Sequence, residues 1–183
     1  MKKLLLAAAA CAALAACQPQ ERAAPAPTAS AESGPHVAAA SDIDRGRYLI
    51  KIAGCNDCHT PGWLQQGMAV PEKDWLIGSL GFSGAWGTSY PANLRLSVQA
   101  LDEDAWVQTM RTRNGLPPMP WVALQQMSEG DVRAIYRYIQ SLGPAGAPAP
   151  AALPPGATPP GVYFYFMPLT GKPPTPAPPP PPG

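Results

Sequence analysis

The sequence is short of net charge, cysteine and histidine, and these shortages narrow the classes of protein it can be. Its 183 residues include 13 basic and 12 acidic ones, so the formal charge of +1 offers no basic excess for binding nucleic acid. Only four cysteines and two histidines are present, which limits the number of covalent or metal-binding sites. Beyond the N-terminus, no apolar run is long enough to predict a transmembrane helix.

Proline is in excess, and it lies mostly at the ends of the chain. Of the 26 prolines, 4 lie in residues 1–40, 6 in residues 41–142 and 16 in residues 143–183. Proline lacks the backbone N–H and clashes with the preceding helical turn, so the last segment has little capacity to form helix. We therefore predict a folded domain at residues 41–142 and a disordered, proline-rich tail at residues 143–183.

The N-terminus has the pattern of an export signal. Residues 1–16 combine two lysines with an apolar run that is too short to span a bilayer, which predicts a signal peptide. The run ends in Leu-Ala-Ala-Cys, which resembles a bacterial lipobox, so Cys17 is predicted to be lipidated. After this cysteine, residues 17–40 are rich in Ala, Pro, Ser and Thr, and are predicted to form a disordered tether.

The residue after the lipobox bears on where the chain is anchored. In lipoproteins an aspartate at this position marks retention in the inner membrane, and this chain has Gln18 instead. The expected location is therefore the outer membrane, on the periplasmic side of a Gram-negative cell envelope. A diacyl anchor would make the attachment stable. The alternatives are an ordinary signal peptide with an incidental Cys17, or lipidation at Cys11.

The chemistry of the chain is concentrated in the sequence CNDCH at residues 55–59. C-x-x-C-H is the attachment signature of c-type haem. Thiols one helical turn apart, at Cys55 and Cys58, can each add to a haem vinyl group, and His59 then supplies the proximal ligand of the iron. A zinc site needs about four protein ligands, and a dithiol redox site would follow a strand; the sequence favours neither. We predict one covalently attached haem c.

The sixth iron ligand is predicted to be a methionine, because ligation by His and Met is typical of electron carriers. Met119 lies between prolines in the sequence LPPMPW, where a stiff extended loop can hold a thioether toward the metal. Met110 and Met127 fit better as core residues, and Met68 lies too close to the haem-binding turn. The alternative ligand is His36, whose recruitment would cost the N-terminal segment much conformational entropy.

Capping signals predict three helices in the domain. Ser41 begins a helix that ends at Gly54, Asp102 begins one that runs to about residue 113, and Ser128 begins one that runs to Leu142 with an apolar stripe. The residues between the first two helices carry many Gly, Pro, Ser and Asn, which predicts loops with room for short strands.

One glycine in the first predicted helix has two interpretations. Gly46 either admits an aromatic side chain of the last helix, Tyr136 or Tyr138, at a close helix crossing, or is merely tolerated.

These features together resemble a class I monohaem cytochrome c. The resemblance rests on a helix with Gly46 running into CNDCH, a long loop, the Met119-Pro120 loop and a last helix with Tyr138-Ile139. The stretch WGTSYPANL at residues 86–94, with PMPW, is similar to haem domains from cytochrome subunits of bacterial membrane-bound alcohol and sugar dehydrogenases. The resemblance covers about residues 41–142. It implies an all-α cytochrome c fold, with three to four helices around one haem.

The resemblance also implies details of the site. Pro61 is expected to orient the His59 ring through its carbonyl group, as second-shell partners of metal ligands do. Tyr90, Asn93 and Arg95 are predicted to donate hydrogen bonds to the haem propionates.

The predicted function is transfer of single electrons by a lipid-anchored periplasmic c-type cytochrome, without catalysis. Its expected partners are a dehydrogenase as donor, and a cytochrome or oxidase as acceptor. The related subunits carry three haem domains, whereas this chain has one CxxCH, which favours a small separate carrier. Two alternatives stay open: the haem acceptor subunit of a dehydrogenase complex, and a ligand-sensing haem protein with an open sixth site.

The tail contains an aromatic run, VYFYFMPL, at residues 162–169. It either packs back on the domain as an extended strap or meets a partner or membrane. We favour the strap, because so much exposed aromatic surface would promote association.

Overall fold

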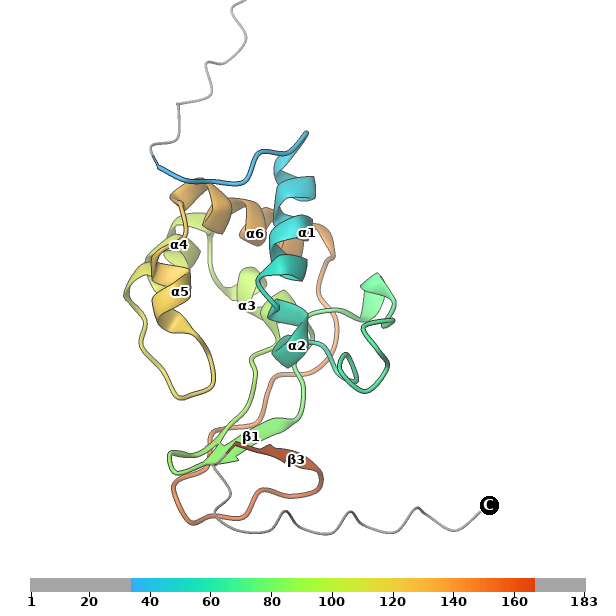
Figure 1. Cartoon of the computed structure of the whole chain (residues 1–183), viewed down its shortest axis with the longest axis vertical. Helices are drawn as coiled ribbons and strands as arrows, with labels where there is room; N and C mark the ends of the chain where they lie inside the picture. Colours follow the sequence, from blue (N-terminus) through green and yellow to red (C-terminus); the bar gives the residue numbers. More distant parts are fainter. Residues whose placement is uncertain (1–33, 167–183) are drawn as a thin grey trace, which may run out of the picture. The chain divides into compact units, whose positions relative to one another are not determined.

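The structure, a computed structural model, describes residues 34–166 (Figure 1). In this part of the chain the elements are α1 (Asp42–Ile52), α2 (Cys55–His59), the 3-10 helix η1 (Glu72–Asp74), β1 (Gly81–Gly84), β2 (Gly87–Ser89), α3 (Leu94–Ala100), α4 (Glu103–Thr112), α5 (Trp121–Gln125), α6 (Glu129–Ser141) and β3 (Tyr163–Tyr165). None of these helices has the length and apolar character needed to span a bilayer. The predicted signal peptide, Cys17, most of the tether and the end of the tail lie outside the described residues.

The three helices predicted from capping signals are confirmed. The side chains of Ser41, Asp102 and Ser128 each accept a hydrogen bond from the backbone N–H three residues on, and so cap α1, α4 and α6. These bonds satisfy N–H groups that have no partner inside the helix. Gly54, with a φ of +68°, stands between α1 and α2 in a left-handed conformation that glycine adopts without strain.

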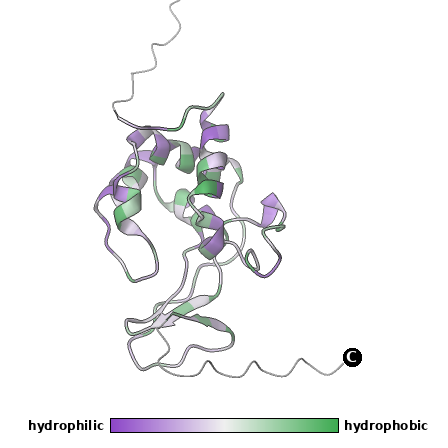
Figure 2. Cartoon of the chain, viewed as in Figure 1, coloured by the Kyte–Doolittle hydropathy of each residue, from purple (hydrophilic) through white to green (hydrophobic). Residues whose placement is uncertain are grey.

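The first and last helices cross at Gly46. A Cβ atom at this position would collide with the carbonyl oxygen of Ala134 and would lie 2.6 Å from the Cβ of Tyr138. Gly46 therefore admits Tyr138, and of the two interpretations of this glycine the close crossing is correct. Hydrophobic and hydrophilic residues alternate around the turns of α6 (Figure 2), so one of its faces is buried while the other meets solvent.

The core lies among the helices. Its most deeply buried apolar side chains come from α1, α3 and α6, with Leu76 from the long loop: Ile50, Leu76, Val98, Val132, Tyr138 and Ile139. Three of the five tryptophans, Trp63, Trp75 and Trp106, belong to the same cluster. The rings of Trp63 and Trp75 meet edge to face with centroids 5.3 Å apart, which closes the loop after α2 onto the core.

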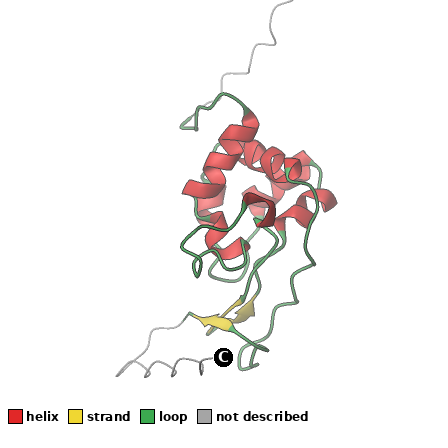
Figure 3. Ribbon diagram, turned by 90° about the vertical axis from the view of Figure 1, so that its right-hand side faces the viewer, coloured by secondary structure: helices red, strands yellow, loops and turns green. Residues whose placement is uncertain are grey.

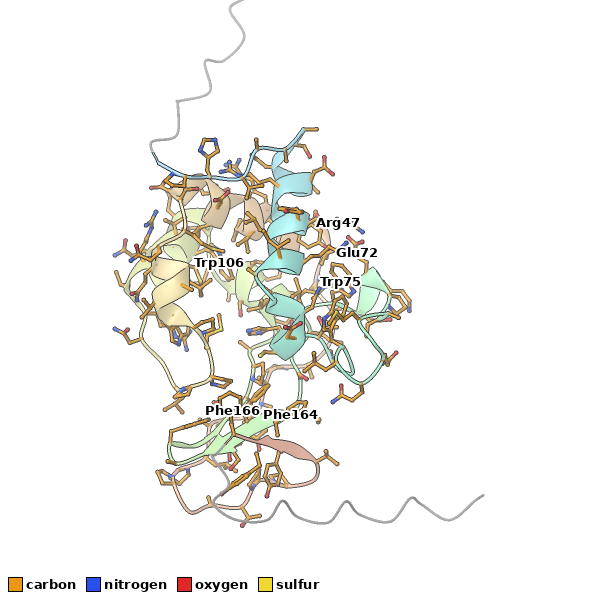
Figure 4. The ribbon with its side chains drawn as sticks, in the orientation of Figure 1. Arg47, Glu72, Trp75, Trp106, Phe164 and Phe166 are labelled. Atoms are coloured by element: carbon orange, nitrogen blue, oxygen red, sulfur yellow. The ribbon has the colours of Figure 1, made fainter. Side chains whose placement is uncertain are left out.

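A charged cluster covers the side of α1. Arg47 donates to both carboxylate oxygens of Glu72, and the hydroxyl of Tyr138 donates to the same carboxylate at 2.8 Å. The guanidinium carbon of Arg47 also lies over the ring of Trp75, 6.0 Å from its centroid. Figure 4 labels Arg47, Glu72 and Trp75 close together at this side of α1. This cluster attaches η1 to α1 and thereby fixes the start of the segment that leads to the sheet.

Residues 94–100 form α3, although the sequence predicts a loop there. Asn93 is the cap of this helix, since its side-chain oxygen accepts a hydrogen bond from the N–H of Leu96 at 3.2 Å. The helix is short and buries Val98 against α6. The sequence-based prediction misses this helix because it assigns Asn93 to the haem propionates and not to a helix cap.

A small sheet corrects the expectation of an all-α fold. β1 pairs antiparallel with β2 and parallel with β3, in the order β2-β1-β3. The strands lie together at one end of the described part, and the helices gather in the other (Figure 3). The helical part still agrees with the prediction of a mainly helical domain.

The tail also differs from the prediction of disorder, because its described residues pack on the domain. Leu153 bridges Thr88, and Phe164 stacks on Phe82 with ring centroids 4.9 Å apart. The N–H of Phe166 donates to Ser83 at 2.7 Å. The described part of the aromatic run, residues 162–166, therefore packs back on the domain as the strap interpretation predicts, while Tyr165 keeps most of its surface exposed. Residues 167–169 of the run lie outside the described residues.

Candidate haem site

The CNDCH sequence forms α2, a single helical turn that follows α1 after Gly54. This turn places Cys55 and Cys58 at a spacing of three residues, on the same side of a helix. Both thiols are partly buried, and neither is in a disulfide. Their position on a fixed turn agrees with the geometry that two thioether links to one planar ring require.

Burial keeps both thiols neutral. Desolvation raises the pKa of Cys55 to about 12, and it also raises the pKa of Cys58. Neutral sulfur atoms in apolar surroundings suit thioether links, which carry no charge.

His59 is buried, and its ring is oriented by a backbone group. Only 6% of the residue is exposed, and Nδ1 lies 2.8 Å from the carbonyl oxygen of Ala92. A carbonyl oxygen can only accept, so Nδ1 carries the hydrogen and Nε2 keeps its lone pair. Burial lowers the pKa of His59, while the hydrogen bond to Ala92 raises it by a smaller amount. The net lowering favours the neutral form of the imidazole. A neutral imidazole with a free Nε2 is the form that ligates a metal.

This bond corrects the role expected for Pro61. The resemblance implied that the carbonyl of Pro61 orients His59, but the acceptor in the structure is Ala92, 33 residues further along the chain. Pro61 itself lies exposed at the start of the next turn. Ala92 is the functional residue that sequence reasoning missed, because a backbone carbonyl leaves no signal in the side-chain pattern.

The backbone around His59 is held by a second set of bonds. The N–H of Gly78 donates to the carbonyl of His59 at 2.9 Å. The hydroxyl of the fully buried Thr60 donates to Asn56 at 2.7 Å and accepts from the N–H of Leu76 at 2.9 Å. Ring and backbone of His59 are therefore both anchored to the segment at residues 76–92.

Met119 lies in the loop between α4 and α5, partly buried against the core cluster. The loop descends beside the end of the helical part that contains α2 (Figure 1), and the hydroxyl of Ser89 donates to the carbonyl of Pro117. The carbonyl of Met119 accepts a hydrogen bond at 3.0 Å from the N–H of Trp121, the first residue of α5. The loop is thus bonded to Ser89 at Pro117, two residues before Met119, and turns into α5 directly after it.

The other candidates for the sixth ligand occupy different environments. Met110 is buried in the core on α4, as predicted, and Met127 packs against the same core. Met68 has a φ of +65° and is 62% exposed. His36 lies exposed in the N-terminal segment with its Nδ1 3.1 Å from the carbonyl of Gly34.

The three residues predicted to contact haem propionates have other partners. The ring of Tyr90 packs over Gly81, where a Cβ atom would lie 2.8 Å from its Cε1 atom. Asn93 donates both hydrogens of its amide to the carbonyls of Ala145 and Ala147. A propionate contact from Asn93 would require these two bonds to be exchanged.

Arg95 likewise donates to backbone groups. Its Nε reaches the carbonyl of Gly143 at 2.5 Å, one terminal nitrogen reaches Lys73 at 2.6 Å and the other reaches Leu142. Asn93 and Arg95 thus connect the loop beside His59 to the beginning of the tail.

The residues present fit a c-type haem. The chain supplies two neutral thiols, a neutral imidazole with a free Nε2, and a thioether on a tied loop. The indole N–H groups of Trp106 and Trp121 are buried and have no hydrogen-bond partner among residues 34–166. Such orphaned donors are rare in native proteins, and a polar edge of a cofactor bound beside Met119 would satisfy that of Trp121, two residues further along the chain. In the same part of the chain, no group of three or more His, Cys, Asp or Glu side chains comes together as a metal site.

Comparison with known proteins finds two cytochrome subunits. The chain is 28% identical over 130 residues to the fructose dehydrogenase cytochrome subunit of Gluconobacter japonicus, covering 65% of this chain and 25% of the relative. It is 32% identical over 119 residues to the gluconate 2-dehydrogenase cytochrome c subunit of Pantoea cypripedii, covering 55% and 26%.

These matches confirm the resemblance to dehydrogenase cytochrome subunits. The chain spans about a quarter of the length of each relative. No family model matches the chain, and no solved structure matches it.

Proposed function

We propose that this protein is a c-type cytochrome that carries single electrons from a dehydrogenase to a cytochrome or oxidase. The observation that carries the proposal is His59, which follows two cysteines on one helical turn and presents a neutral imidazole with a free Nε2. The similarity to two dehydrogenase cytochrome subunits supports the same function. The chain itself transforms no substrate in this proposal.

Each residue has a distinct part in this function. Cys55 and Cys58 would hold the haem covalently, and His59 and Met119 would ligate its iron. When bound, haem supplies a reversible one-electron change at its iron. The bonds of His59 to Ala92 and Gly78 hold the ligand still in both oxidation states, which keeps the reorganisation small.

A second candidate is the haem acceptor subunit of a dehydrogenase complex. It is favoured by the similarity to two proteins that are themselves cytochrome subunits of dehydrogenases. The single CxxCH of this chain favours the carrier. Purification of the tagged chain from its own cells distinguishes the two functions. A subunit should co-elute with a dehydrogenase in a fixed ratio, whereas a separate carrier should elute without one.

The test of electron transfer is an optical redox titration of the purified holoprotein. We expect one reversible transition that fits a single electron, and a ferrous spectrum that does not change when carbon monoxide is added. Rapid binding of carbon monoxide by the wild type would contradict the carrier and support a ligand-sensing protein with an open sixth site.

Anchoring of the chain at the periplasmic side of the outer membrane is part of the proposal. Lipidation at Cys17 would attach the domain to the membrane through residues 18–40. The variant Cys17→Ser should move the protein from the membrane fraction to the soluble periplasmic fraction. Cys11→Ser is the matched control and should leave the protein in the membrane. The reverse pattern would place the lipid on Cys11.

A further inference from the structure

We propose that the start of the tail is a latch that positions the proximal haem ligand. Residues 143–147 hold the loop at residues 91–95, and this loop presents the carbonyl of Ala92 to His59. In this proposal Asn93 is a positioning residue, which acts on the iron ligand through its neighbour in the chain. The proposal rests on the proposed haem function.

Asn93 is at the centre of the latch. The residue is 3% exposed, and its amide nitrogen donates to Ala145 at 2.7 Å and to Ala147 at 3.1 Å. Its side-chain oxygen accepts from the N–H of Leu96, so the same side chain also caps α3. One buried amide thus joins three segments, which fixes its position strongly.

Arg95 adds a second tie. Its buried guanidinium donates to the carbonyls of Leu142 and Gly143 at the end of α6, and to Lys73 in η1. A charged donor makes hydrogen bonds that are stronger than those between neutral groups. The tail is thereby joined to the loop on both sides of the first turn of α3.

Gly146 allows the close approach. Its φ is +72°, and a Cβ atom there would lie 3.0 Å from the amide nitrogen of Asn93 and 3.0 Å from the Cβ of Ile77. A side chain at this position would press on the segment that leads to Gly78, whose N–H binds the carbonyl of His59. The tail therefore packs on both segments that hold the ligand.

The latch acts through the bond from Nδ1 of His59 to Ala92. A carbonyl acceptor on this nitrogen raises the basicity of the imidazole, and a more basic ligand stabilises the ferric state. If the latch loosens, the loop at residues 91–95 gains freedom and this bond weakens on average. The reduction potential then rises, and the Nδ1 hydrogen exchanges faster with solvent.

The decisive variant is Asn93→Asp in the full-length holoprotein. An aspartate keeps the oxygen that caps α3 but removes both hydrogens that bind Ala145 and Ala147. We expect full haem content and at least tenfold faster exchange of the His59 Nδ1 hydrogen, followed by NMR. The potential is compared in the glycine variants below, because the new carboxylate of Asn93→Asp shifts the potential by its own charge.

Two tail glycines give a matched pair. Gly146 and Gly156 both have positive φ, and a Cβ atom at Gly156 would have nothing within 4 Å. Both variants to alanine therefore carry a similar backbone cost, but only Gly146→Ala presses on Asn93. We expect Gly146→Ala to raise the potential and Gly156→Ala to leave it unchanged.

The outcomes separate this proposal from the proposed function. A wild-type exchange rate of the His59 Nδ1 hydrogen in Asn93→Asp would overturn the latch. If Asn93→Asp yields no holoprotein, the glycine pair decides, and equal potentials in Gly146→Ala and Gly156→Ala overturn the latch. A wild type without haem would instead overturn the proposed function.

Discussion

The Cβ of Tyr138 in α6 lies where a side chain on Gly46 of α1 would have to stand, with only 2.6 Å between them. The variant Gly46→Ala would therefore push the two helices apart or distort the carbonyl of Ala134. Overpacking of this kind costs 1–3 kcal/mol and sometimes more. We expect a loss of about 3 kcal/mol in the free energy of unfolding of the holoprotein, measured by chemical denaturation.

The control for this variant is Gly67→Ala. Gly67 has a φ of +60° but nothing within 4 Å of a Cβ atom, so only the left-handed backbone is penalised, by about 1 kcal/mol. Equal losses in the two variants would contradict a close crossing of α1 and α6.

The parts of this fold that are specified by side chains at fixed spacing can be predicted from the sequence, and those that depend on backbone groups cannot. The caps at Ser41, Asp102 and Ser128 are side chains at fixed spacing before apolar periods, so their helices follow from the sequence. CNDCH, at residues 55–59, predicts a haem attachment site from side chains at fixed spacing in the same way. Asn93 has the same capping chemistry, but α3 is too short to show a clear period.

The tail and the orientation of His59 depend on backbone groups. Ala145, Ala147 and Ala92 act through carbonyl oxygens that every residue has, so composition gives no sign of them. A segment rich in proline and almost without charge therefore predicts disorder, although buried side chains elsewhere in the chain bind its backbone.

The bidentate pair of Arg47 and Glu72 predicts a pH dependence of stability. Hydrogen bonds from Arg47 lower the pKa of Glu72 below its ordinary value of 4.5, and the bond from Tyr138 adds to this. A lowered folded-state pKa stabilises the fold above the unfolded pKa, and this stabilisation is lost as the pH falls through the folded value. Since both side chains are partly exposed, Arg47→Gln should cost about 0.5 kcal/mol at pH 7.

Denaturation curves at several pH values test this pair. The difference between wild type and Arg47→Gln should be constant above about pH 5, and should vanish below the lowered pKa of Glu72. Lys73→Gln also removes one positive charge, from the residue next to Glu72 in η1. The side chain of Lys73 is 81% exposed, so this variant should cost little at any pH. A difference that grows as the pH falls would have the wrong sign for this account.

The buried pair of Arg45 and Asp131 predicts a larger effect. The Nε of Arg45 lies 2.6 Å from Asp131, both residues are buried, and the N–H of Val37 binds the same oxygen at 3.2 Å. Replacing Asp131 removes the buried carboxylate that faces the guanidinium of Arg45, and breaking a buried ion pair costs about 3–5 kcal/mol. Asp131→Ala should therefore lower the free energy of unfolding by about 3 kcal/mol.

Glu129→Ala is the comparison for this variant. Glu129 pairs with Arg133 on the exposed face of the same helix, and such pairs contribute about 0.5 kcal/mol. If Asp131→Ala lowers the free energy of unfolding as little as Glu129→Ala does, the buried pair contributes less to stability than this account predicts.

The loop of Met119 predicts a spectroscopic difference between two methionines. Met119→Ala should remove the weak far-red band of methionine ligation, and its ferrous form should bind carbon monoxide. Met127→Ala removes a sulfur that also packs against the core, and should keep the band. A wild type that lacks the band, or a band that persists in Met119→Ala, would assign the sixth ligand elsewhere.

The most direct test of the central claim is the intact mass of the protein under denaturing conditions. The wild type, expressed in a host that attaches haem to a known c-type cytochrome, should exceed the mass of its mature polypeptide and lipid by one haem. The variant Cys55→Ser/Cys58→Ser should lack this excess. A wild type without added haem mass, in cells that load the known cytochrome, would contradict the account.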